Sequence, residues 1–107
     1  MSFPLLREAF EDDTAELADF ARVLQRELLR AAQELEHAIR SQDAGAVADL
    51  KHKLKTSLHL LGDEQLKANL QQLATNMQAG HAPSPSAREQ VVDRLRRLVS
   101  ALERERW

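Results

Sequence analysis

The sequence has no cysteine, few glycines and prolines, and few aromatic residues, and each shortage excludes a class of protein. Without cysteine there can be no disulfide framework, thiolate nucleophile or cysteine-ligated zinc site. No apolar run approaches the roughly 20 residues that a bilayer crossing needs. The N-terminal stretch is too short and too soon charged for a signal peptide. We therefore expect a cytoplasmic protein that does not insert into a membrane.

The charge balance also excludes a simple nucleic-acid-binding surface. The net charge of −2 provides no field that would attract a polyanion. The C-terminal stretch is rich in arginine, but acidic residues alternate with it, and only 4% of the chain is aromatic. No nucleic-acid partner is expected. A glycine-rich phosphate loop is also missing, so ATP binding by this chain is not expected.

What the sequence does contain is a helix-forming inventory of Leu, Ala, Glu, Gln and Arg. Its 107 residues are enough for one domain with a modest core. We predict an all-α fold, an up-down-up-down four-helix bundle with a short additional N-terminal helix. A single domain is expected over 1–107, with its core at about 14–105. The leucine stripes do not separate a monomer from a dimer, and we take a monomer as the working expectation.

Apolar residues at spacings of three and four predict most of the helices. The expected helices cover 3–11, 14–41, 43–62, 64–79 and a last stretch ending near 105. The expected N-caps are Asp12 or Asp13, Asp43, Asp63, and Ser84 or Ser86. We expect Val23, Leu29, Ala32 and Ile39 to widen the buried stripe of the second helix. The arginines of the last helix, Arg94 among them, are expected to cover its outer surface.

The stretch 43–66 organises the rest of the chain. Its apolar stripe consists of Val47, Leu50, Leu54, Leu58 and Leu61. On a helical wheel His52 falls about 160° from the middle of this stripe. The sequence therefore predicts an exposed imidazole on a helix that Asp43 begins and Gly62 ends.

The residues around His52 resemble the motif of histidine phosphotransfer (HPt) domains in two-component phosphorelays. The family has a His, any residue, an apolar residue, Lys and Gly, then a second Gly ten positions after the His. Here these positions hold His52, Lys53, Leu54, Lys55, Thr56 and Gly62, and Asp43 matches the acidic residue common nine positions before the His. Thr56 departs from the family's Gly, and Lys51 stands where a small residue is usual.

The resemblance implies a phosphorelay phosphoprotein, a phosphocarrier without catalytic turnover of its own. His52 would accept a phosphoryl group and pass it to or from the aspartate of a response-regulator receiver domain, and a hybrid sensor histidine kinase is the other expected partner. Neutral imidazole is a nucleophile that needs no general base. Lys55, and less strongly Lys53, would contact the phosphate, and Mg²⁺ would be held by the receiver, so this chain needs no cofactor.

The resemblance assigns the surrounding residues to a partner surface or to structure. Thr56, Lys51 and His59 would border the partner, where Thr56 could crowd the receiver's approach. Leu54, Gly62 and Asp43 would be structural. His59 lies seven residues after His52, roughly 10.5 Å along a helix, so one metal ion cannot bind both rings and no metal site is expected.

Two alternatives to a phosphocarrier remain open on the sequence. The first is a docking or regulatory module of the same fold that carries no phosphate, a drift that Thr56 and Lys51 would signal. The second is a helical oligomerisation or regulatory domain with no link to phosphorelay signalling.

Overall fold

Amphipathic helices make up the protein, as the apolar spacings predict. The computed structural model describes residues 3–11 and 13–107, and this part of the chain contains no strand. The helices are α1 (Pro4–Ala9), α2 (Thr14–Arg40), α3 (Ala44–Leu61), α4 (Glu64–Gln78), α5 (Pro85–Arg88), a π-helical segment η1 (Glu89–Asp93) and α6 (Arg94–Arg104). The all-α prediction is confirmed.

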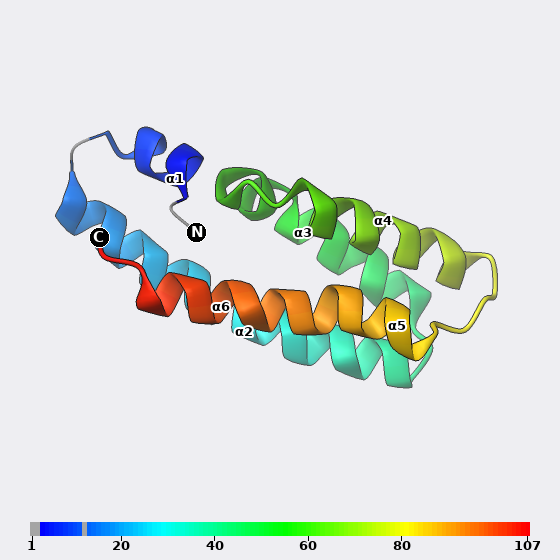
Figure 1. Ribbon diagram of the computed structural model, residues 1–107. Helices are drawn as coiled ribbons and strands as arrows, with labels where there is room; N and C mark the ends of the chain where they lie inside the picture. Colours follow the sequence, from blue (N-terminus) through cyan, green and yellow to red (C-terminus); the bar gives the residue numbers. More distant parts are fainter. Residues whose placement is uncertain (1–2, 12) are drawn as a thin grey trace.

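The long helices lie lengthwise beside one another in a molecule of 47 × 19 × 18 Å (Figure 1). α3 packs most extensively on α4, α2 packs on α6, and α2 also contacts α3. η1 joins the two halves because it contacts both α2 and α4. α1 lies across one end and packs on α3, while the loop after α4 lies at the opposite end (Figure 1).

Leucine stripes from all the long helices form one core. Side chains that are almost completely buried include Leu24, Leu28, Leu35, Leu54, Leu58, Leu66, Leu70, Leu95, Leu98 and Leu102. Met77 completes the stripe of α4, and it is 8% exposed. Burying each such side chain contributes about 1.5–3 kcal/mol, so the stripes determine which face of each helix points inward.

Side-chain caps begin the helices at residues that the sequence names. Asp13, Asp43 and Asp63 each accept a hydrogen bond from the backbone N–H three residues further on, at 3.0 Å. Ser84, rather than Ser86, caps α5 in the same way at 3.1 Å. Asp12 lies outside the described residues. These caps satisfy backbone donors that a helix leaves free at its first turn.

Two apolar residues of α2 do not join the core. Val23 and Leu29 are each 45% exposed, so the expectation that they widen the buried stripe is wrong. They lie on either side of the stripe, each roughly 100° or more from its middle on the helical wheel, and are separated by roughly 120° across the exposed face. The neighbouring helices therefore cover a narrower strip of α2 than its apolar residues suggest.

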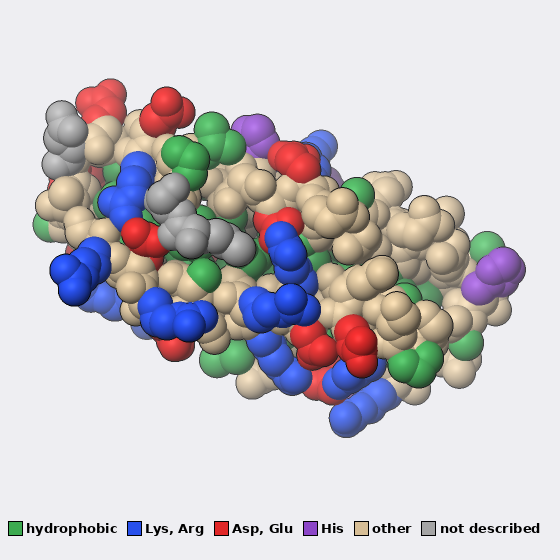
Figure 2. All heavy atoms as spheres, viewed as in Figure 1, with side chains coloured by type: hydrophobic (Ala, Val, Ile, Leu, Met, Phe, Trp, Pro, Cys, Tyr) green, Lys and Arg blue, Asp and Glu red, His purple; other side chains and the backbone are tan. Residues whose placement is uncertain are grey.

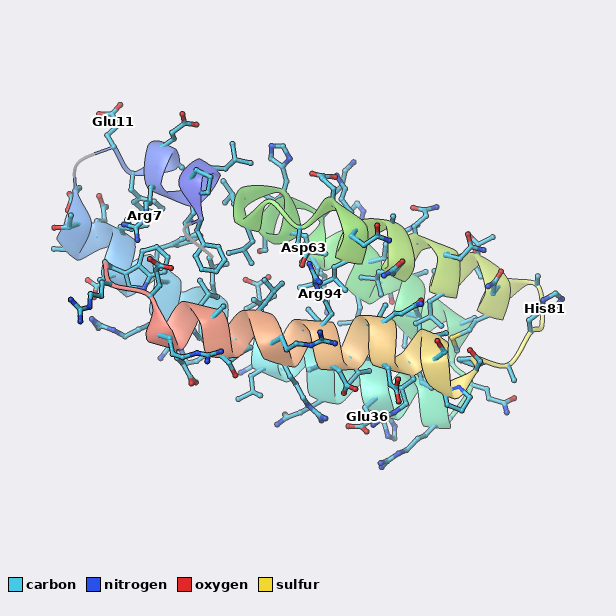
Figure 3. All side chains as sticks on the ribbon, viewed as in Figure 1. Arg7, Glu11, Glu36, Asp63, His81 and Arg94 are labelled. Carbon is cyan, nitrogen blue, oxygen red and sulfur yellow. The ribbon has the colours of Figure 1, made fainter. Side chains whose placement is uncertain are left out.

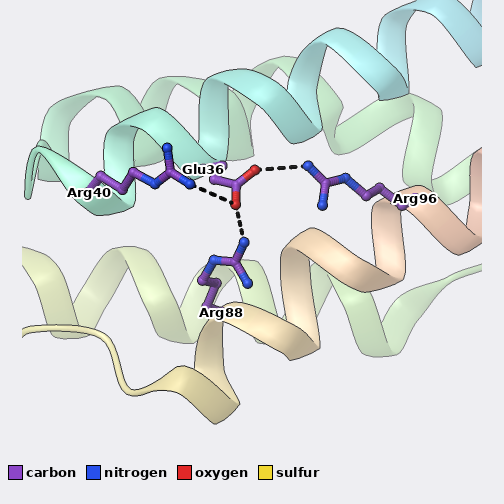
Figure 4. Close-up of polar contacts among 4 residues, drawn as sticks. All are labelled: Glu36, Arg40, Arg88 and Arg96. Carbon is purple, nitrogen blue, oxygen red and sulfur yellow. Dashed lines mark hydrogen bonds and ion pairs between the residues drawn. The ribbon is translucent and has the colours of Figure 1, made fainter.

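Glu36 of α2 connects this helix to the last helical stretch, which consists of α5, η1 and α6. Its half-buried carboxylate accepts hydrogen bonds from Arg88 and, at 2.8 Å, from Arg96, and Arg40 lies 3.5 Å away (Figure 4). The hydrogen bond from Arg88 is the main cause that lowers the pKa of Glu36 from its ordinary value of 4.5. The same contact raises the pKa of Arg88. The carboxylate is therefore charged in the folded protein at neutral pH.

The π-helical turn explains how Arg88 and Arg96 both reach Glu36. In a regular α-helix, residues eight apart are rotated by roughly 80° from each other. A π turn accommodates about one extra residue, which brings the two positions to within roughly 20° of one face. η1 lies between them, so the two guanidinium groups converge on one carboxylate. The apolar spacing of this stretch does not reveal the π turn.

A second set of contacts holds α1 to the C-terminal residues. The Trp107 ring stacks on Phe3 with centroids 5.8 Å apart, and the Arg7 guanidinium lies over Trp107 at 4.9 Å. Arg7 also pairs with Glu105 at 2.8 Å, between α1 and the C-terminal residues (Figure 3). These contacts close the end of the core that α1 covers.

The Glu36 contacts predict a pH-dependent stability. The folded-state pKa of Glu36 is lowered, so its stabilising contribution is complete above pH 4.5 and is lost as the pH falls through the folded-state value. Glu36→Gln should therefore lower the free energy of unfolding at neutral pH, and the difference from wild type should disappear in acid. Urea denaturation over a pH series measures this.

Glu34→Gln is the matched control, since Glu34 is exposed on the same helix and makes no ion pair with the described residues. If Glu36→Gln remained less stable than wild type by the same free energy in acid, the charge of the Glu36 carboxylate would not be what stabilises the fold.

Candidate functional site

His52 projects from the outer face of α3. The stripe Val47, Leu50, Leu54, Leu58 and Leu61 is buried, each residue at most 5% exposed, and His52 on the opposite side is exposed. The predicted exposure is therefore confirmed. Within residues 3–11 and 13–107, no side chain or backbone group hydrogen-bonds to the His52 ring or pairs with it, so the exposed ring has no partner there.

The helix that carries His52 is fixed at both ends by the residues expected there. At the N-terminus, Asp43 Oδ1 accepts a hydrogen bond from the Ala46 N–H at 3.0 Å. At the C-terminus, Gly62 adopts φ 72°, the left-handed conformation that glycine takes without a Cβ penalty. The His52 backbone therefore lies within a regular helix, well away from fraying ends.

Positive charge surrounds His52. Lys53 and Lys55 are exposed and Lys51 is half-buried. Over the described part of the chain none of these three lysines makes an ion pair, whereas Arg88, Arg94 and Arg96 of the last helical stretch are all paired. The lysine ammonium groups are thus available to an incoming anion. Lys55, three residues after His52, is the nearest of them on the same face.

Two residues near His52 were not singled out from the sequence. Asp49, three residues before His52, is exposed on a neighbouring face, and the three-residue spacing could have identified it. Ala48, four residues before His52, leaves that side of the ring open. Cα–Cβ bonds in a helix all tilt toward its N-terminus, so His52 leans toward the turn of Ala48 and Asp49, and Lys55 and Thr56 lean toward the turn that carries His52.

A hydrogen bond anchors α3 to α2 one turn beyond His52. Ser57 is 9% exposed, and its Oγ donates to Oε1 of the half-buried Glu27 at 3.2 Å. No local pattern predicts this pair, since the two residues are thirty positions apart. It fixes the rotation of α3 relative to α2 and so the direction in which His52 points.

A groove runs between α2 and α3 beside the lysines. One hollow of about 370 Å³ has walls that include Val23, Arg26, Arg30 and Lys53. A second of about 450 Å³ shares Lys53 with the first and extends to His37 and Asp43. Lys53 therefore borders the groove, on the other side of α3 from Lys55. The exposed Val23 contributes to the apolar part of its lining.

The other histidines have different surroundings. His59 Nδ1 lies 3.6 Å from Glu64 Oε1, so its ring faces a carboxylate. His37 lines the second hollow, and His81 lies in the loop at the far end of the molecule (Figure 3). His52 alone among the four has unpaired lysines one and three residues after it.

The last helical stretch carries structural arginines as well as surface ones. Arg94 Nε donates to Asp63 Oδ2 at 2.8 Å, and the two side chains face each other between α4 and α6 (Figure 3). Asp63 is only 5% exposed, and its contact raises the pKa of Arg94. The expectation that Arg94 only covers the outer surface is therefore wrong. Figure 2 shows basic side chains, which are all arginines in this helix, along α6 with carboxylates between them.

Residues 3–11 and 13–107 contain no group of three or more His, Cys, Asp or Glu side chains that could hold a metal ion. None of the helices in the described part of the chain combines the length and apolarity that a bilayer crossing requires.

Comparison with known proteins gives no match to the chain, whether with protein-family models, curated proteins or solved structures. Function is therefore inferred from the chain's own residues and their geometry.

The double role of Asp63 predicts a graded loss of stability. Asp63→Ala removes both the cap of α4 and the partner of Arg94, and should lower the free energy of unfolding by about 1–2 kcal/mol or more. Asp63→Asn keeps an oxygen that can cap the helix and should cost less. Urea denaturation of both variants separates the two contributions, and equal losses would show that the cap contributes nothing.

Proposed function

We propose that this chain is a histidine phosphotransfer domain, in which His52 accepts a phosphoryl group and exchanges it with the aspartate of a receiver domain. The observation that carries the proposal is the exposed, unpartnered His52 ring beside three unpaired lysines on a capped helix. The match of His52, Leu54, Lys55 and Gly62 to the family motif supports it.

The proposal includes the arrangement of the helices. α2, α3, α4 and the α5–η1–α6 stretch would be the four members of an up-down-up-down bundle, with α1 as the additional helix and the whole chain as one domain. The pairings of α2 with α6 and of α3 with α4 support this arrangement, as does the short link from Ser41 to Asp43.

The chemistry that follows from this proposal is a reversible transfer of a phosphoryl group between His52 and the aspartate of the receiver. An imidazole nitrogen of His52 attacks the phosphorus of the partner's aspartyl phosphate, an N–P bond forms, and the P–O bond to the carboxylate breaks. The carboxylate leaves with the electron pair, and the ring nitrogen later returns the group in the reverse sense. Mg²⁺ on the receiver and the Lys55 ammonium would neutralise the phosphoryl charge.

One observation favours a second candidate, a docking module of the same shape that carries no phosphate. The α2–α3 groove, with Val23 exposed on its edge, offers an apolar contact surface that does not involve His52. A docking module would bind a receiver without taking up its phosphoryl group, so one assay separates the two.

The decisive assay uses a receiver domain charged with radiolabelled phosphate. Wild type should acquire an acid-labile, base-stable label, and His52→Gln should acquire none. His81→Gln is the matched control, since His81 is exposed in the loop after α4 at one end of the molecule (Figure 3), and its labelling should equal wild type.

Each other result of this assay has a definite meaning. Label persisting in His52→Gln would place the acceptor elsewhere and overturn the proposal. Binding without label on wild type would support the docking module, and no binding to any receiver would favour a helical domain outside phosphorelay signalling.

Lys55 is expected to contact the phosphoryl group during transfer. Lys55→Ala should slow labelling about 10-fold, which corresponds to losing about 1.4 kcal/mol of charged contact. Lys55→Arg keeps the charge and should recover most of the rate, and circular dichroism should show an unchanged helix content for both variants. Unchanged kinetics in Lys55→Ala would remove Lys55 from the site.

A further inference from the structure

Thr56 occupies the position one helical turn after His52, where the family motif has glycine. It is exposed on α3, and residues four apart on a helix have Cβ atoms about 5–6 Å apart. Helical side chains lean toward the N-terminus. The Thr56 side chain therefore leans toward the turn that carries His52, on the face where a phosphoryl group on that ring would lie.

The Thr56 hydroxyl is free to bind a ligand. Within residues 3–11 and 13–107 it makes no hydrogen bond, not even to the carbonyl four residues back that hydroxyls in helices often use. Two other hydroxyls on or beside α3 are engaged: Ser41 Oγ donates to the His37 carbonyl at 2.9 Å, and Ser57 Oγ donates to Glu27. Thr56 thus offers an uncommitted donor beside His52, which glycine could not supply.

We propose that the Thr56 hydroxyl donates a hydrogen bond to an oxygen of the phosphoryl group on His52 and prolongs the life of the phosphohistidine. This inference rests on the proposed function. In hydrolysis, a water oxygen attacks phosphorus and the N–P bond breaks. The electron pair returns to the ring nitrogen, which takes a proton, and inorganic phosphate leaves.

The direction of the effect follows from the charge on the phosphoryl oxygens. In a loose transition state the phosphoryl group approaches metaphosphate, so its oxygens carry less negative charge than in the phosphohistidine. A neutral hydroxyl donor therefore binds the ground state more strongly than the transition state of hydrolysis, and such a contact slows hydrolysis. Transfer between domains differs, because there the Lys55 charge also attracts the anionic receiver site. Thr56 would make this chain a longer-lived phosphoryl store than a domain with glycine there.

The alternative role of Thr56 is steric, because its bulk could hinder a receiver approaching His52. The two roles predict different behaviour in variants. Thr56→Val keeps the size and β-branching without the hydroxyl, Thr56→Ser keeps the hydroxyl without the methyl group, and Thr56→Gly loses both. A hydroxyl contact affects the lifetime of phosphohistidine without any partner, whereas crowding affects only the rate of transfer from a receiver.

The test charges the full chain with phosphoramidate, a small donor whose own P–N bond breaks and releases ammonia as the N–P bond to the ring forms. Decay of the phosphohistidine is followed by phosphorus NMR, with His52→Gln subtracted as the background from other histidines. We expect wild type and Thr56→Ser to decay alike, and Thr56→Val and Thr56→Gly about 3- to 10-fold faster, the range for one hydrogen bond. Circular dichroism checks that every variant keeps its helix content.

The outcomes separate this inference from the proposed function. Equal phosphohistidine decay in all four proteins would overturn the hydroxyl contact while leaving His52 as the acceptor. Slow decay in Thr56→Val with fast decay in Thr56→Gly would do the same. If receiver transfer to wild type fails in the labelling assay, the proposed function fails, whatever the decay rates show. Faster transfer from the receiver in Thr56→Gly, with unchanged phosphohistidine decay, would assign the steric role instead.

Discussion

The burial of one leucine stripe of α3 is the constraint on which the candidate site depends. Leu50, Leu54 and Leu58 fill the space that α3 shares with its neighbours, and turning the helix to expose them would lose several kcal/mol of apolar burial. The opposite face must then point to solvent. His52 is on that face for this reason, and the Ser57–Glu27 hydrogen bond holds the same orientation from the polar side of the stripe.

The two kinds of basic residue have separate roles in this fold. Arginines hold the last helical stretch, where the planar guanidinium of Arg88, Arg94 or Arg96 meets a buried or half-buried carboxylate. Lysines surround His52 and remain unpaired within the described residues. The division suits a phosphate-handling surface, because Arg88, Arg94 and Arg96 are already neutralised by carboxylates, whereas the charges of the lysines beside His52 are left to attract an anion.

Local chemistry was sufficient to predict the ends of most helices and the direction of His52. Asp43 and Gly62 bound α3 because a carboxylate cap and a left-handed glycine act within one turn of the chain. Predictions that needed the neighbours failed: Val23 and Leu29 are exposed because no helix covers those edges of α2. Its spacing from His52 was enough to identify Asp49 as a neighbour of the site. Glu27 could not be identified in this way, because its partner Ser57 lies on another helix.

The sequence alone determined that the chain is helical, where most of its helices begin and end, and that His52 faces away from the leucines. Each of these depends on residues within a few turns of each other. Tertiary structure decided what the charges do. Arg88 and Arg96 share Glu36 only because a π turn aligns them, and Arg94 binds Asp63 only because α6 passes the start of α4. An ion pair needs two atoms within a few ångströms of each other, and for residues far apart in the chain only packing sets that distance.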